Sequence, residues 1–189
     1  MSEIQIVSFF NHLGQGTFVD SLAAFASNIS VLILLWAVLI ALSFYEDKKN
    51  GKIFLLSSIV AIIIYFVIND FIFKYIIADV FGLMRIRPYL ASPEEIIPIG
   101  MKFTDSSFPS GHMASTIAVL GVLISFYKKY WIPILFFILF MAFARMHQGM
   151  HYPSDVLVGS LLGIFYAFAG IKLAKKILKK KKKAKKIGY

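Results

Sequence analysis

Three polar clusters interrupt an otherwise apolar chain, and each holds residue types that can do chemistry. They are Arg85–Pro88, Phe108–His112 and Arg145–Asp155. Arginine side chains give charge-assisted, bidentate hydrogen bonds to phosphate oxygens. Histidine transfers protons near neutral pH and can also act as a nucleophile. The arginines therefore indicate a site that could bind an anion such as phosphate, with histidines close by in the sequence.

The second and third clusters lie where apolar runs begin, at predicted helix starts. Ser110 and Gly111 open one run, so their free backbone N–H groups and the helix dipole favour an anion. Pro153 suits the first turn of a helix, because its missing N–H is not needed there. Asp155 then lies in that first turn, close enough to fix the ring of His151.

The rest of the chain must position these clusters, and it consists largely of long apolar runs. Of the 189 residues, 59% are hydrophobic and 16% are charged, there is no cysteine, and the mean hydropathy is +0.76. This composition excludes a disordered chain, a collagen-like repeat and a disulfide-stapled module. A helix needs about 20 mostly apolar residues to cross a bilayer. The runs predict spans near residues 22–45, 53–78, 110–127, 131–148 and 153–173.

We therefore expect an all-α, polytopic membrane bundle of about five spans. Residues 1–189 would form a single integral-membrane domain. Residues 3–13 are too short to span and predict an interfacial helix, a sixth helix ended by Gly14 and Gly16.

The formal net charge of +10 is distributed unevenly, and this predicts the orientation in the membrane. Lysines gather at 48–52, 128–129 and 172–186, whereas the opposite side carries only four basic residues, Arg85, Arg87, Lys102 and Arg145. The positive-inside rule puts the polybasic tail, 172–189, in the cytoplasm and the 79–108 loop outside. A lysine block after a span favours contact with anionic bilayer lipids over nucleic acid.

Each polar cluster alone also has a simpler interpretation. An Arg-Pro pair is most often a loop with a solvated arginine, and Ser-Gly before a helix is commonly only a cap. A histidine at a membrane interface, as His147 is expected to be, needs no function. The functional hypothesis rests on co-occurrence, because ionisable groups near the membrane boundary are costly and therefore functional by default.

The clusters resemble the signature of the type-2 phosphatidic acid phosphatase superfamily, membrane lipid phosphatases related to vanadium haloperoxidases. The matching residues, in order and spacing, are Arg87-Pro88, Pro109-Ser110-Gly111-His112, and Arg145 with His151 and Asp155. The resemblance covers about residues 70–173. Two positions depart from the pattern, since Val80 stands where the family has lysine and Ala144 where it has serine.

Lys74, two helical turns before Val80, is the nearest substitute for the family lysine. Two interpretations are open. Asp70 lies four residues earlier, so the two side chains could neutralise one another on a buried helix. Alternatively, Lys74 reaches the phosphate, and Arg85 is the residue that could take this role in its place.

The resemblance implies metal-independent hydrolysis of a phosphomonoester or pyrophosphate through a phosphohistidine. His151 would attack phosphorus, oriented by Asp155, while His112 would protonate the leaving oxygen and then activate water. The phosphate oxygens would be bound by Arg87, Arg145, Ser110, Gly111 and Lys74 or Arg85. No cofactor and no metal site are expected, because no carboxylate cluster or His/Cys set has metal-ligand spacing.

The implied substrate is a membrane lipid whose phosphate head meets the site while its tails stay in the bilayer. Minimal members of the family act on undecaprenyl pyrophosphate, phosphatidylglycerol phosphate or the 1-phosphate of lipid A, and the sequence does not separate the three. We expect a multi-pass protein of the bacterial inner membrane with its active site on the periplasmic side.

Two other classes of function remain open. A small transporter would also place charges in a bundle, but it usually needs more spans and a polar path. The middles of these spans are apolar apart from Asp70 and Lys74. A lipid-binding scaffold could use the lysine tail, yet would not need His112, His151 and Asp155.

Overall fold

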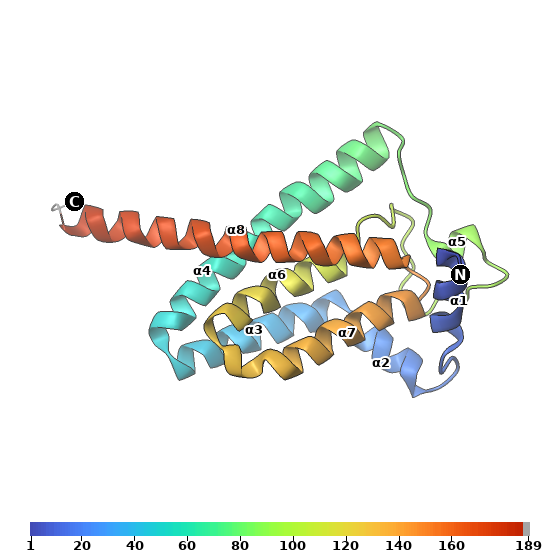
Figure 1. Ribbon diagram of the computed structural model, residues 1–189, viewed down its shortest axis with the longest axis horizontal. Coiled ribbons are helices and arrows are strands. Elements are labelled where there is room, and N and C mark those ends of the chain that lie inside the picture. Colours follow the sequence, from blue (N-terminus) through green and yellow to red (C-terminus); the bar gives the residue numbers. More distant parts are fainter. Residues whose placement is uncertain (187–189) are drawn as a thin grey trace.

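A computed structural model describes residues 1–186, with side chains as far as Lys181, and this range is built from helices and loops (Figure 1). The helices are α1 (Glu3–His12), α2 (Phe18–Ala26), α3 (Ile29–Glu46), α4 (Lys48–Tyr65), η1 (Phe66–Val80), α5 (Pro88–Ala91), α6 (Gly111–Phe126), η2 (Lys128–Tyr130), α7 (Trp131–His147) and α8 (Pro153–Lys186). The all-helical bundle predicted from the sequence is confirmed.

Four helical segments are long and apolar enough to cross a membrane. They are α3, α4 continued by the wider π-type helix η1, η2 with α7, and most of α8. The fifth apolar helix, α6, has 16 residues, which corresponds to about 24 Å. In Figure 1, α8 continues well beyond the other helices, along the predicted polybasic tail. The last three residues of that tail lie outside the described range.

The first predicted span, 22–45, is wrong at its N-terminal end, because the structure breaks it into α2 and α3. The Asn28 side chain caps α3 by accepting from the backbone N–H groups of Ser30 and Val31, at 2.9 and 3.4 Å. An N-cap has non-helical backbone, so α2 ends at Ala26. The break leaves the Ser27 carbonyl outside a regular helix.

Close approach of α8 to α6 depends on two glycines at GxxxG spacing, Gly159 and Gly163. A Cβ at Gly159 would lie 2.5 Å from the carbonyl oxygen of Ser110, and one at Gly163 would lie 2.7 Å from that of Ala114. Small residues let helix backbones meet in this way inside membranes. The starts of the two helices are therefore in contact, and the Ser110 amide donates to the Asp155 carbonyl at 3.1 Å.

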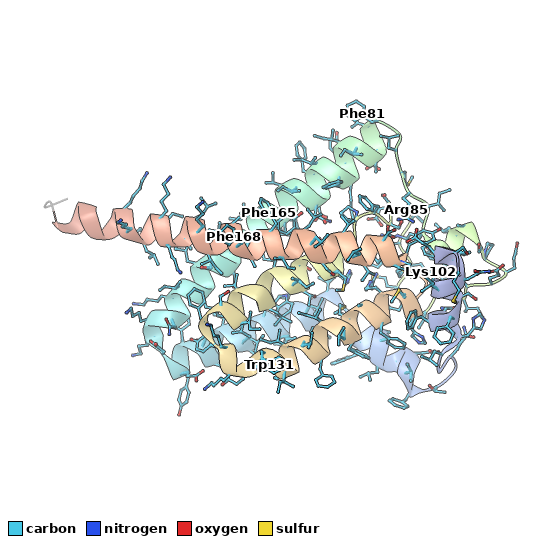
Figure 2. All side chains as sticks on the ribbon, in the orientation of Figure 1. Phe81, Arg85, Lys102, Trp131, Phe165 and Phe168 are labelled. Atoms are coloured by element: carbon cyan, nitrogen blue, oxygen red, sulfur yellow. The ribbon has the colours of Figure 1, made fainter. Side chains whose placement is uncertain are left out.

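The core lies between α4, α6 and α8, where Phe54 and Tyr166 are completely buried. The outward faces are apolar and exposed, with Trp131, Phe165 and Phe168 projecting away from the bundle (Figure 2). An apolar exterior of this kind suits contact with lipid tails in a bilayer, and soluble proteins rarely expose so large an apolar area to water.

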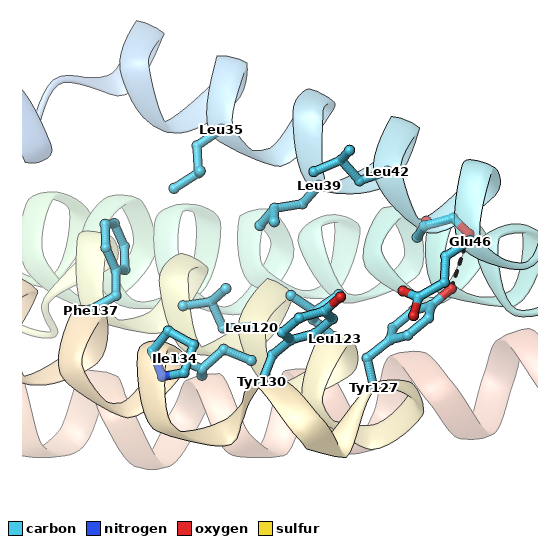
Figure 3. Close-up of a pocket in the computed structure, with 12 residues that line it drawn as sticks. Leu35, Leu39, Leu42, Glu46, Leu120, Leu123, Tyr127, Tyr130, Ile134 and Phe137 are labelled. Carbon is cyan, nitrogen blue, oxygen red and sulfur yellow. Dashed lines mark hydrogen bonds between the residues drawn. The ribbon is translucent and has the colours of Figure 1, made fainter.

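An apolar cavity of about 330 Å³ lies between α3, α6 and α7 (Figure 3). Its walls include Leu39, Leu123 and Ile134, and the Tyr127 hydroxyl closes one end by donating to the Ser43 carbonyl at 3.1 Å. The cavity extends toward Glu46, the end of α3 away from Asn28. None of the predicted site residues lines it.

Candidate active site

The predicted site residues come together at one end of the bundle, where α6 and α8 begin and α7 ends. Figure 1 shows the 81–110 loop and α1 packed over this end. Arg87 from the loop, Arg145 from the last turn of α7 and His151 from the α7–α8 turn are all buried. Segments distant in sequence thus surround one histidine.

The His151 ring is held in a defined orientation and protonation state. Its Nδ1 atom lies 2.8 Å from the carbonyl oxygen of Ser107. A carbonyl can only accept, so Nδ1 carries the hydrogen and Nε2 carries the lone pair. Burial, followed by the positive charges of Arg145, Arg87 and Lys74, lowers the pKa of His151 well below its ordinary value. The ring is therefore neutral at neutral pH, with Nε2 available.

Asp155 lies beside His151 but is not its hydrogen-bond partner, contrary to the sequence-based expectation. The distance from Asp155 Oδ2 to His151 Nδ1 is 3.7 Å, beyond hydrogen-bond range. Instead, Oδ2 accepts from the backbone N–H of Tyr152 at 2.9 Å. The Ser107 carbonyl, which sequence reasoning missed, holds the ring, while the carboxylate provides negative charge nearby.

Arg87 is fixed next to the unprotonated nitrogen of His151. Its Nη1 atom lies 3.5 Å from His151 Nε2 and donates to the Met150 carbonyl at 3.1 Å. Its Nε donates to the Asp105 carbonyl at 3.0 Å, and its Nη2 to the Asp105 carboxylate at 2.6 Å. These bonds from the loop and from the α7–α8 turn hold the guanidinium against the atom that would attack a phosphate.

Arg145 and Ser110 are buried and incompletely satisfied. Arg145 Nη1 donates to Gln148 Oε1 at 2.7 Å, but its Nε has no partner among the described residues, and neither does the Ser110 hydroxyl. Buried donors without partners are unfavourable by about 1–3 kcal/mol each. Arg145 also lines a cavity of about 270 Å³ with Ser27 and Phe103. An anion beside Arg145 and Ser110 would supply the missing acceptors, although Ser110 itself does not line this cavity.

The start of α6 differs from the predicted anion nest in one respect. The Ser110 N–H is not free, because it donates to the Asp155 carbonyl, so the hydroxyl is the group Ser110 has available. Gly111 is the first helical residue, and an N–H at that position has no partner within the helix. The positive end of the α6 dipole therefore still points toward the site.

Lys74 is paired with Asp105 in the structure, not with Asp70 as one of the two interpretations held. Lys74 Nζ lies 2.7 Å from Asp105 Oδ2. Asp70 accepts instead from the Tyr65 hydroxyl and the Asn69 amide, both at 3.3 Å. Although burial acts to raise the pKa of Asp105, Lys74 and Arg87 outweigh it and lower that pKa. One carboxylate thus joins Lys74 to Arg87 at the site.

His112 lies in the first turn of α6, where its Nε2 is 2.9 Å from the Ser27 carbonyl oxygen. That carbonyl is the one freed by the break between α2 and α3. Because it can only accept, Nε2 carries a hydrogen and Nδ1 is the nitrogen left for proton exchange.

His147, interpreted from the sequence as an interfacial residue, is buried and tethers three helices. Its two ring nitrogens lie 2.9 Å from the Phe10 carbonyl oxygen and 2.9 Å from Asp20 Oδ1. The residue therefore joins α1 and α2 to the end of α7, and its replacement would loosen the packing of these helices.

Arg85 does not join the other cations around His151. Its guanidinium contacts Asp155, Ser154 and Glu3 instead.

Over residues 1–186, no group of three or more His, Asp or Glu residues is placed to hold a metal ion.

The apolar helical bundle is that of a membrane protein, and the cations gathered around its buried histidine suit an anionic phosphate group. The model of the PAP2 superfamily matches residues 52–179. The chain belongs to this superfamily, which confirms the resemblance carried by its motifs.

Relatives of known activity are similar over much of the chain. An undecaprenyl-diphosphatase of Sulfolobus acidocaldarius is 31% identical over 70% of this chain and 59% of its own length. A lipid A 4'-phosphatase of Bacteroides thetaiotaomicron is 27% identical over 86% of this chain and 72% of its own. The chain thus spans less than two thirds of the first relative.

Two solved structures share the fold. LpxE from Aquifex aeolicus matches with a TM-score of 0.59 and 19% identity, covering 89% of this chain and 93% of its own. A PAP2-type phosphatidylglycerolphosphate phosphatase from Bacillus subtilis matches with a TM-score of 0.63 and 22% identity, covering 92% of this chain and 85% of its own.

Proposed function

We propose that the protein hydrolyses the phosphate or pyrophosphate head of a membrane lipid through a phosphohistidine at His151. The observation that carries the proposal is a neutral, buried His151 whose Nε2 carries the lone pair and lies 3.5 Å from Arg87 Nη1. Lys74 and Arg145 add positive charge close to the same ring. A nucleophile surrounded by cations suits attack on an anionic phosphorus centre.

In the first step, His151 Nε2 forms a bond to phosphorus and the bond from phosphorus to the lipid oxygen breaks. For this step His112 must be doubly protonated, with Nε2–H on the Ser27 carbonyl, and it gives that oxygen the proton of Nδ1 and becomes neutral. Attack makes the His151 ring cationic, and the nearby carboxylate of Asp155 favours this charge. In the second step, His112 removes a proton from water, the water oxygen bonds to phosphorus, and the bond to His151 breaks.

Arg87, Arg145, Lys74, the Ser110 hydroxyl and the Gly111 amide would bind the phosphate oxygens. The unpartnered Arg145 Nε and Ser110 Oγ support this assignment, because each needs an acceptor. Their charges would stabilise the transition state, where negative charge is spread over the equatorial oxygens. Each step uses only side-chain, main-chain and water groups, so we propose that the reaction is independent of metal ions.

A lipid substrate is supported by the names of the relatives, which include an undecaprenyl-diphosphatase and a lipid A phosphatase. The test is phosphate release by the purified protein in detergent with EDTA. The panel contains undecaprenyl pyrophosphate, phosphatidylglycerol phosphate and lipid A. Release from at least one lipid is expected; no release from any lipid, or release only when divalent ions are added, would contradict the proposal.

We further propose that the site faces the periplasm of a bacterial inner membrane and that the C-terminus is cytoplasmic. The lysines at 48–52, 128–129 and 172–186 support this orientation, as does the position of the site at the opposite end of the bundle. A reporter fused after Tyr189 should read cytoplasmic, and one inserted within residues 90–100 should read periplasmic. The reversed pattern would overturn the orientation.

Lys74 provides a direct test of the phosphate-binding set. Lys74→Met should lower kcat/KM about ten- to a hundredfold on every active substrate, because one cation near the transferred group is lost. The fold should persist, since Asp105 keeps its bond to Arg87. Phosphate release and thermal unfolding would be measured beside Lys102→Met, which removes an exposed cation from the 81–110 loop that follows η1. A Lys74→Met protein as active as Lys102→Met would remove Lys74 from the site.

A further inference from the structure

The N-terminal helix places a carboxylate directly on the turn that carries the catalytic residues. Glu3 Oε1 accepts from the backbone N–H of Ser154 at 2.9 Å, across 151 residues of sequence. Glu3 Oε2 lies 2.5 Å from Arg85 Nη2, across 82 residues. Although burial acts to raise the pKa of Glu3, the hydrogen bonds from Ser154 and Arg85 lower it, so the side chain is ionised at neutral pH.

Arg85 connects this carboxylate to Asp155. Its Nη1 atom donates to Asp155 Oδ1 at 2.6 Å and to the Ser154 hydroxyl at 2.7 Å. Its guanidinium carbon lies 4.1 Å from the centre of the Tyr152 ring, within the range of a cation–π contact. One arginine therefore contacts three residues of the turn that follows His151.

The helix that carries Glu3 is itself anchored, so Glu3 is held at a fixed point. Asn11 in α1 is buried and donates to the carbonyls of Ile97 and His147 at 2.8 and 2.6 Å. It also accepts from the Ile97 N–H at 2.9 Å. The Ser2 side chain caps the other end of α1, next to Glu3. These bonds tie α1 to the 81–110 loop and to α7.

We propose that Glu3 and Arg85 are positioning residues that fix Asp155 beside His151, and that Arg85 is not a phosphate ligand. This inference rests on the proposed function. With Oδ1 bound by Arg85, the Asp155 carboxylate presents Oδ2 to the Tyr152 N–H and to His151. Arg85 also balances a carboxylate that is completely buried, a charge that would otherwise be strongly unfavourable.

The charge balance separates Arg85 from the phosphate-binding arginines. Arg85 already has two carboxylates as partners, Glu3 and Asp155, so little of its positive charge is left to attract a third anion. Arg145, by contrast, has a buried Nε without a partner among the described residues. A phosphate would gain more from Arg145 than from Arg85.

The first test compares Arg85→Ala with Lys102→Ala, which removes an exposed cation from the same loop (Figure 2). Arg85→Ala should lower kcat about thirty- to a hundredfold and leave KM within about twofold of the parent, because a positioning residue acts on the reacting group without touching substrate. Arg85→Lys should recover part of kcat. A raised KM with unchanged kcat, or full activity, would overturn the proposal.

The second test is a double-mutant cycle, which remains informative if Arg85→Ala does not fold, because Arg85→Gln, which removes the charge and keeps most of the side-chain length, then takes its place. Glu3→Gln should lower kcat about three- to tenfold, while Glu94→Gln, on an exposed loop carboxylate, should not. In the Arg85 variant, Glu3→Gln should lower kcat little further, because the two residues act as one unit. Fully additive losses would overturn the proposal. A parent without phosphate release would overturn the proposed function instead.

Discussion

His151→Ala is expected to lose phosphate release by at least about 10⁴-fold on every substrate, because removal of a nucleophile eliminates the covalent route. The fold should survive, since the main polar loss is the hydrogen bond to the Ser107 carbonyl, and leaving that buried acceptor unpaired costs about 1–3 kcal/mol. Phosphate release in detergent and thermal unfolding would be measured together.

The matched control for this variant is His12→Ala, because His12 is an exposed histidine at the end of α1. It should keep full activity. The loss in His151→Ala would then be specific to His151 and not a general effect of replacing a histidine. A His151→Ala protein that folds and still turns over within about tenfold of the parent would rule out His151 as the nucleophile.

His112→Ala is expected to lower the rate about 10²- to 10⁴-fold on a lipid phosphomonoester, the range typical of a lost general acid–base group. The loss should be much smaller for phosphorylation of the enzyme by a substrate with a good leaving group, because such a group departs without a proton. His112 meets only the Ser27 carbonyl through Nε2, so the fold should tolerate alanine.

The comparison therefore uses two substrates, a lipid phosphomonoester and an aryl phosphate, with burst and steady-state rates measured for each. His12→Ala again provides the control. Equal losses in the burst phase on both substrates would contradict the role of His112 in protonating the leaving oxygen.

The helices were largely predictable because a bilayer imposes a length and an apolar composition on each span. The predicted segments 110–127, 131–148 and 153–173 correspond to α6, α7 and the apolar part of α8. The break at Ser27 and Asn28 was missed, since both residues lie in an uncharged run where hydropathy is continuous. α2 ends because the Asn28 side chain caps the start of α3. This local interaction does not change the average hydropathy of the run.

The site was predictable only where its residues are recognisable in the sequence by their type and spacing. His151, Arg87 and Arg145 met these conditions, and the structure brings them together. Ser107 and Ser27 act through main-chain carbonyls, and any residue type has a carbonyl, so no sequence signal marks them.

Long-range pairs were the second source of error. Asp70 is four residues from Lys74, the spacing that favours a pair on one helix, yet the structure pairs Lys74 with Asp105, 31 residues away. Glu3 meets Arg85 across an even longer separation. Pairing at such distances depends on how the irregular 81–110 loop folds, and no periodic pattern in the sequence encodes it.

The most direct measurement is rapid-quench trapping of the phosphoenzyme formed from a ³²P-labelled lipid phosphate, followed by mass spectrometry of the labelled peptide. We expect acid-labile label on His151 in the parent protein and in His12→Ala, and none in His151→Ala. Label on another residue, or phosphate release by the parent with no phosphoenzyme formed, would contradict the account.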